Sequence, residues 1–121
     1  QIVRAIIESV AYQTYDLFEA MKHDGLRPRL VKVDGGMVMN NWFSQFLSDV
    51  VNVGVLRPKV QETTALGAAF MAGLQIGVYK SLKDISKNWS LDKKFSPKMK
   101  NNSRLKLIKG WSKAIKRTLI N

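Results

Sequence analysis

The chain has 121 residues, 45% of them hydrophobic and 24% charged, which suits one packed domain and excludes a two-domain enzyme with its active site in an internal cleft. It contains no cysteine and one histidine, so disulfides, cysteine nucleophiles and cysteine metal sites are excluded. The net charge is +11, but residues 1–80 carry 8 Lys and Arg against 7 Asp and Glu, whereas residues 81–121 carry 12 against 2. The basic character therefore belongs to the tail.

Hydrophobic periodicity and turn residues divide the chain into helices and strands. We predict helices over 2–22, over 41–51, between Thr63 and Gly77, and over 104–119, strands over 30–33 and 53–56, and a loosely structured polar excursion over 80–103. No apolar run reaches the ~18 residues that a membrane span needs, and the first residues lack a signal-peptide pattern. The sequence thus predicts a cytoplasmic protein without a membrane span.

The ends of the predicted helices carry recognisable signals. Asp24-Gly25, followed by Pro28, stops the first helix, and Asn40 is a good N-cap for the second. Thr63 is the expected N-cap of the third helix, whose many small residues let another backbone approach closely and so predict burial against a sheet or a second helix. The apolar stripe expected for the last helix comprises Ile108, Trp111, Ile115 and Leu119.

The alternation of helices and strands predicts an α/β fold in which parallel strands are joined by right-handed crossovers. Two strands are too few for an independently stable sheet, so we expect further strands upstream. The chain opens on Gln1 with helical periodicity already under way, which favours a piece cut or split from a longer protein.

The stretch that is most informative about function joins the first predicted strand to the second helix through Asp34, Gly35 and Gly36. Glycines there put bare backbone at the carboxyl edge of a sheet, where α/β folds bind ligands, and let a flat ring or a phosphate approach closely. The pattern matches neither the dinucleotide fingerprint nor a P-loop, and an ordinary tight turn also explains it. Asn40 could hydrogen-bond a ribose or a base, or serve only as a helix cap, and Asp34 more simply caps the turn than binds a metal.

Four segments stand out together: residues 4–13 (RAIIESVAYQ), 33–41 (VDGGMVMNN), 57–73 (RPKVQETTALGAAFMAG) and 110–115 (GWSKAI). In this order they resemble the carboxy-terminal part of the bacterial glycerol kinases, within the carbohydrate kinase family of FGGY type. The resemblance covers nearly the whole chain. Its first and last segments favour the glycerol kinases over the xylulose and gluconate kinases.

The resemblance implies a partial ribonuclease H-like (actin-like ATPase) domain, the second lobe of a sugar kinase, with a helical C-terminal extension. It assigns residues 1–80 to the C-terminal part of the nucleotide-binding lobe, and residues 81–121 to a basic surface excursion and closing amphipathic helix of the same lobe. It also implies that ATP is the cofactor, with Gly36 against the adenine, Asn40 bonded to the base or ribose, and Gly35 making the turn.

The resemblance further implies that the catalytic aspartate, the glycerol-binding residues and the main Mg²⁺ contacts lie in an upstream lobe outside this sequence. We therefore predict no catalytic or metal-binding residue in this chain, no kinase activity for the chain alone, and the N-terminal part of the kinase as its partner. The alternative is a basic interaction module that binds nucleic acid or an acidic partner through the Lys-rich tail. We expect no nucleic-acid binding, because few aromatic residues interleave with the lysines.

Overall fold

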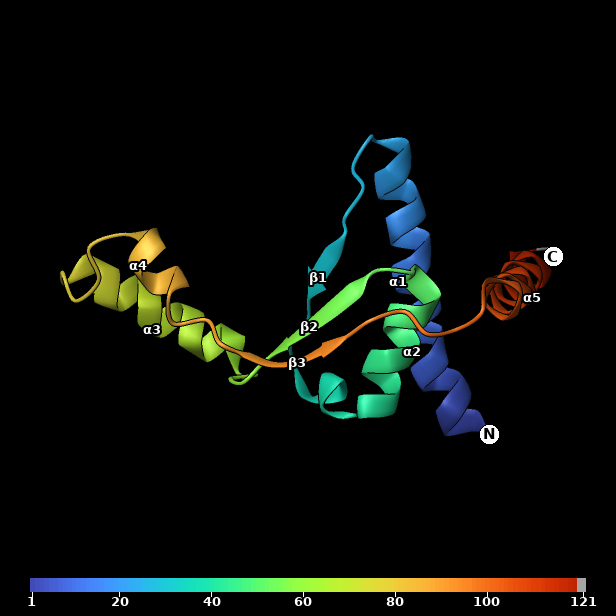
Figure 1. Cartoon of the computed structure of the whole chain (residues 1–121), viewed down its shortest axis with the longest axis horizontal. Helices are drawn as coiled ribbons and strands as arrows, with labels where there is room; N and C mark the ends of the chain where they lie inside the picture. The colour runs from blue at the N-terminus through green and yellow to red at the C-terminus, as the bar shows by residue number, and fades with distance from the viewer. Residues whose placement is uncertain (120–121) are drawn as a thin grey trace.

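The computed structural model describes residues 1–119, which form a small mixed α/β fold with helices extending from it on two sides (Figure 1). In chain order the elements are α1 (Ile2–His23), β1 (Leu30–Lys32), the 3-10 helix η1 (Gly36–Met39), α2 (Asn41–Val51), β2 (Gly54–Pro58), α3 (Thr63–Gln75), α4 (Leu82–Ser86), β3 (Leu91–Phe95) and α5 (Asn101–Leu119). Every predicted helix and strand is confirmed, and η1, α4 and β3 are additional.

A three-stranded sheet in the order β1-β2-β3 forms the centre of the fold. β1 and β2 are parallel, with Val31 opposite Val55, as the alternation of helices and strands predicted. β3 runs antiparallel to β2, with Phe95 opposite Val55. The third strand thus comes from the segment 80–103, and the prediction that this segment is only loosely structured was wrong.

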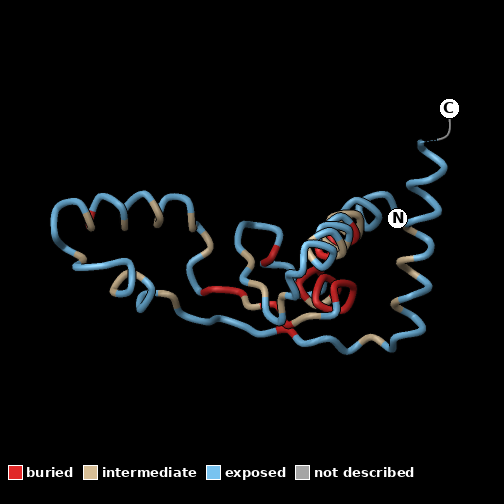
Figure 2. The backbone as a smooth tube through the Cα atoms, turned by 90° about the horizontal axis from the view of Figure 1, so that it is seen from above, coloured by how far each residue is buried: buried red, intermediate tan, exposed pale blue. Residues whose placement is uncertain are grey.

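The core lies between the sheet and the helices α1 and α2, which pack on each other (Figure 2). α2 contributes most to it, since 8 of its 11 residues are buried. Two of these are serines, and burial is tolerated because Ser44 Oγ donates to the carbonyl of Val38 at 2.8 Å and Ser48 Oγ to the carbonyl of Val53 at 2.7 Å. The buried apolar residues are Ala11, Tyr12, Phe18, Val38, Phe43, Phe46, Leu47, Val50, Val51, Val55 and Phe95.

The helix ends follow the predicted signals, with two differences. α1 ends just before Asp24-Gly25, and Gly25 has a φ of +84°, a conformation that favours glycine. Thr63 is the first residue of α3 rather than its N-cap, which is Glu62. α5 begins at Asn101, three residues before its predicted start, because α2 holds the segment that leads into it.

The helices α3 and α4 form an arm that extends away from the sheet, with Gly73 its only buried residue (Figure 1). The arm is closed by aromatic packing, since Phe70 meets Tyr79 edge to face with ring centroids 5.5 Å apart. The predicted burial of α3 against a sheet or a second helix was therefore wrong, since apart from Gly73 its residues are exposed or only partly buried.

α5 lies against the end of the molecule opposite the arm. Trp111 stacks on Tyr12 of α1 at a centroid distance of 5.4 Å, and Leu107 packs against the core. Of the predicted apolar stripe, Ile108 and Trp111 are partly buried, whereas Ile115 and Leu119 are exposed, so only half of the stripe packs against the protein. Within residues 1–119, no helix combines the length and the apolar composition that crossing a bilayer requires.

Candidate functional site

The candidate site is the glycine loop, which we define as residues 34–40, between the end of β1 and the start of α2. Gly35 has a φ of +86°, which a residue with a side chain rarely adopts, so this turn requires glycine. A Cβ atom added at Gly35 or Gly36 would meet no heavy atom within 4 Å other than those of its chain neighbours. The backbone of both glycines is therefore open to a flat ligand.

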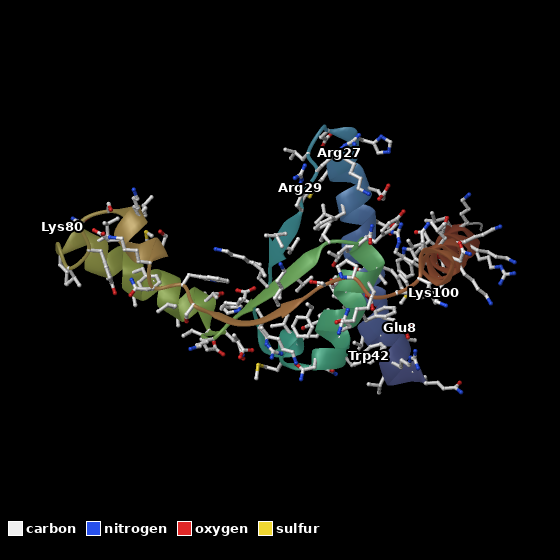
Figure 3. All side chains as sticks on the ribbon, in the orientation of Figure 1. Glu8, Arg27, Arg29, Trp42, Lys80 and Lys100 are labelled. Atoms are coloured by element: carbon white, nitrogen blue, oxygen red, sulfur yellow. The ribbon has the colours of Figure 1, made fainter. Side chains whose placement is uncertain are left out.

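Apolar side chains flank this bare backbone. Met37 is 44% exposed and Met39 is 53% exposed, so both thioethers are available for contact with a ring. Trp42 lies at the start of α2 (Figure 3). Its ring stacks on that of Phe46 with the centroids 5.1 Å apart, and Cζ of Arg4 lies 5.3 Å from the centroid of the Trp42 ring. Trp42 thus packs on α2, but it is still 42% exposed beside the loop.

Asn40 caps α2, as one of its two predicted roles required. Its side-chain oxygen Oδ1 accepts the backbone N–H of Trp42 at 3.0 Å and that of Phe43 at 3.3 Å. The oxygen is thus occupied, whereas the amide Nδ2, which carries two donor hydrogens, belongs to an exposed residue. Asn40 can therefore cap the helix and still offer donors to a ligand at the same time.

Asp34 acts differently from the predicted turn cap. Its carboxylate accepts a hydrogen bond from the hydroxyl of Thr63, which ties the start of the loop to the first residue of α3. No cluster of three or more His, Asp or Glu residues that could hold a metal ion occurs in the described part of the chain.

A hollow of about 270 Å³ lies beside the start of the loop. It is lined by Lys32, Val33, Asp34, Pro58, Thr63 and Trp89. Lys32 Nζ stands 4.1 Å from the centroid of the Trp89 ring, so a cation–π contact closes one wall. A larger hollow of about 530 Å³ lies between α1 and α5, and none of the loop residues lines it.

Arg57 is the residue of this region that the sequence analysis missed. It lies on β2, is 7% exposed, and donates from Nη1 to the carbonyl oxygens of Val38 at 2.8 Å and Met39 at 3.2 Å. Its Nε donates to Asp92 Oδ2 of β3 at 2.7 Å. The sequence carried no signal that could have singled it out, because its burial and its partners come from the tertiary fold.

Comparisons with known proteins place the chain among sugar kinases. Residues 1–76 match the C-terminal domain of the FGGY family of carbohydrate kinases. Over 119 residues, or 98% of the chain, the sequence is 52% identical to a glycerol kinase of Gluconobacter oxydans and 53% identical to one of Thermoanaerobacter pseudethanolicus. The matched region is 23% and 24% of those proteins, so the chain spans about a quarter of their length.

Solved structures agree. The crystal structure of Plasmodium falciparum glycerol kinase with ADP superposes with a TM-score of 0.81 and 37% identity, over 99% of this chain and 24% of that one. The xylulose kinase of Lactobacillus acidophilus superposes with a TM-score of 0.78 over 98% of this chain and 24% of that one, and at 23% identity it shows the fold alone. The predicted class, a partial ribonuclease H-like (actin-like ATPase) α/β domain with a helical end, is confirmed.

Proposed function

Because this chain belongs to the FGGY family of carbohydrate kinases, we propose that it contributes the adenosine-binding part of an ATP-dependent glycerol kinase. The proposed reaction converts glycerol to glycerol 3-phosphate, which makes the whole protein a phosphotransferase with an alcohol as acceptor. The observation that carries the proposal is the bare backbone of Gly35 and Gly36 beside the exposed amide of Asn40.

Each loop residue has a separate task in this proposal. Gly36 lies against the face of the adenine, since nothing within 4 Å obstructs it. Asn40 donates from Nδ2 to the base or the ribose while its Oδ1 stays on the helix cap. Gly35 makes the turn that separates the strand from the loop. When bound, ATP supplies the phosphoryl group that is transferred.

Adenosine recognition supplies mainly binding energy, whereas the rate of phosphoryl transfer depends on the alignment of the hydroxyl and on charge stabilisation at the phosphate. We propose that the catalytic base, the glycerol-binding residues and most Mg²⁺ contacts come from the part of the kinase outside this sequence. The chain alone is then inactive and binds nucleotide weakly, because one wall of its pocket is missing. Within this proposal, residues 1–80 belong to the nucleotide-binding lobe, residues 81–121 form its basic surface extension, and the protein works in the cytoplasm.

Complementation tests the proposal. The 121-residue chain is mixed or co-expressed with the preceding part of the Thermoanaerobacter pseudethanolicus glycerol kinase, and formation of glycerol 3-phosphate from ATP is measured. We expect activity from the pair and none from either piece alone. Kinase activity in the isolated chain would contradict the division of labour, and an inactive pair that assembles stably would contradict the proposed reaction.

A loop variant tests the adenosine contact directly. Gly36→Val fills open space at a position whose φ is not in the left-handed region, so the chain should fold normally. The isopropyl group would stand where the adenine lies, and we expect affinity for ADP to fall at least ~10-fold, as measured by calorimetry. Gly110→Val on α5, which also adds a side chain in open space, is the matched control and should bind ADP as the wild type does.

The basic interaction module stays the alternative, because the lysines of α5 are exposed. A true electrostatic binder of nucleic acid loses affinity steeply as salt rises. Binding of single-stranded and duplex DNA, titrated against NaCl, therefore decides between the two proposals. We expect no binding at physiological salt, whereas tight, salt-sensitive binding would favour the alternative.

A further inference from the structure

Arg57 forms hydrogen bonds with the backbone at the end of the glycine loop. Its guanidinium is buried and reaches from β2 to the last two carbonyls of η1, those of Val38 and Met39, at 2.8 Å and 3.2 Å. These carbonyls immediately precede Asn40 in the chain. The contact thus fixes the peptide groups through which the loop enters α2.

The carbonyl of Val38 is held twice. It accepts from Arg57 Nη1 and also from Ser44 Oγ of α2, both at 2.8 Å. A carbonyl oxygen has two lone pairs, so both are engaged, and the peptide plane between Val38 and Met39 has one orientation that satisfies them. The direction of the chain at Asn40 is therefore set by β2 and α2 together.

The same guanidinium is bound from its other side. Its Nε donates to Asp92 Oδ2 on β3 at 2.7 Å, and the Asp92 side chain is 41% exposed, so that carboxylate also faces solvent. An arginine can do this because its planar fork presents donors in two directions, whereas a lysine offers one compact ammonium group. The fork links strand β3, strand β2 and the loop into one unit.

We propose that Arg57 is a positioning residue for adenosine binding: it acts through the carbonyls of Val38 and Met39 to hold the backbone of Gly36 and the amide of Asn40 in register with the nucleotide. This inference rests on the proposed function of the loop. Arg57 itself is buried beneath the loop and does not touch the ligand.

The test uses the whole 121-residue chain with Arg57→Met, Arg57→Lys and a matched control. Arg104→Met is that control, because Arg104 Nη1 also donates to a backbone carbonyl, that of Val50, but at the far end of α2. The first readout needs no nucleotide: ¹⁵N order parameters of the loop amides. We expect them to fall from about 0.85 to below 0.6 in Arg57→Met and to stay unchanged in Arg104→Met.

The second readout is the dissociation constant for ADP, which we expect to rise about tenfold in Arg57→Met. Arg57→Lys keeps the charge but cannot span both partners, so it should fold and still bind ADP several-fold more weakly. In the complemented enzyme the KM for ATP should rise while kcat and the KM for glycerol stay constant. An effect on stability alone would not produce that split.

The two proposals fail in different ways. Loop order parameters that are unchanged in a folded Arg57→Met chain, or equally reduced in Arg104→Met, would overturn the positioning role whether or not nucleotide binds. Absence of ADP binding by the wild-type chain and by the complemented enzyme would overturn the proposed function, and the order parameters would still decide the role of Arg57. If Arg57→Met does not fold, the same comparison is made with Arg57→Lys.

Discussion

Asp49 is a buried carboxylate that ties α2 to the segment leading into α5. It is 9% exposed, and its Oδ1 accepts the backbone N–H of Lys98 at 2.6 Å and that of Met99 at 3.1 Å. The same oxygen accepts from Gln45 Nε2 at 3.1 Å, and that amide also donates to the carbonyl of Ser96 at 2.8 Å. Three donors on one carboxylate oxygen offset the cost of burying its charge.

Asp49→Asn should therefore destabilise the chain. The substitution keeps one acceptor oxygen but removes the negative charge, so the bonds from Lys98, Met99 and Gln45 lose their charge assistance, and we expect a loss of about 1–2 kcal/mol in the free energy of unfolding by urea. Asp24→Asn, at an exposed position after α1, is the control and should change stability by less than about 0.5 kcal/mol. Equal losses in the two variants would show that the contacts of Asp49 do not contribute.

The residues of the site differ in how far the sequence could predict them. Gly35, Gly36 and Asn40 act through local chemistry, a left-handed turn and a helix cap, so their pattern alone indicated a special loop. Arg57 contributes through Val38 and Asp92, which lie 19 and 35 positions away along the chain. Only the tertiary fold brings these partners together, which is why a charged residue on a short strand gave no warning of its role.

At the scale of elements, α3 carries two glycines in very different surroundings. A Cβ at Gly67 would meet no heavy atom within 4 Å, whereas a Cβ at Gly73 would stand 2.8 Å from Cε2 of the Tyr79 ring. Tyr79 is itself packed edge to face on Phe70, so the ring has little room to retreat. Gly73 thus lets the chain after α3 fold back onto the helix, and Gly67 has no such task in this chain.

Alanine at the two positions should have opposite effects on the arm. Both substitutions improve helix propensity, by about 0.5–1 kcal/mol relative to glycine. Gly67→Ala should show that gain in thermal unfolding and in hydrogen exchange of the α3 amides, whereas Gly73→Ala should lose about 1–3 kcal/mol to overpacking against Tyr79. The pair shares one helix and one chemical change, so the difference between them isolates the ring contact. A gain in both would mean that the ring yields without cost.

The elements that escaped prediction share a physical reason. β3 (Leu91–Phe95) has four exposed residues and only Phe95 buried, so it lacks the apolar alternation by which a strand is recognised. Its strand conformation comes from pairing with β2, a contact between segments more than 30 positions apart. The helices α1 and α2, by contrast, carry apolar residues at helical spacing and were predicted to within a residue or two of their observed ends.

At the scale of the whole molecule, Tyr12 stands where three helices meet. It is 8% exposed, its ring lies edge to face with Phe46 of α2 at 5.7 Å, and it stacks on Trp111 of α5 at 5.4 Å. The Trp111 Nε1–H in turn donates to Asp16 Oδ2 on α1 at 2.7 Å, so an aromatic stack and a hydrogen bond together dock α5. Ionisation of Tyr12 would therefore place a negative charge where α1, α2 and α5 pack together.

The free energy of unfolding should depend on Tyr12 at high pH. Burial, and to a smaller extent the nearby Glu8 carboxylate, raise the pKa of Tyr12 from 10.0 to about 12. Between these values the unfolded tyrosine has lost its proton while the folded one keeps it, so the free energy of unfolding must fall as pH rises from 10 to 12. Tyr12→Phe removes this titration but retains the stack, and its stability measured by urea unfolding should fall less steeply over the same range. All other ionisable groups are the same in both proteins, so their contribution cancels in the comparison. Parallel pH profiles for the two would show that Tyr12 ionises as freely in the folded chain as in the unfolded one.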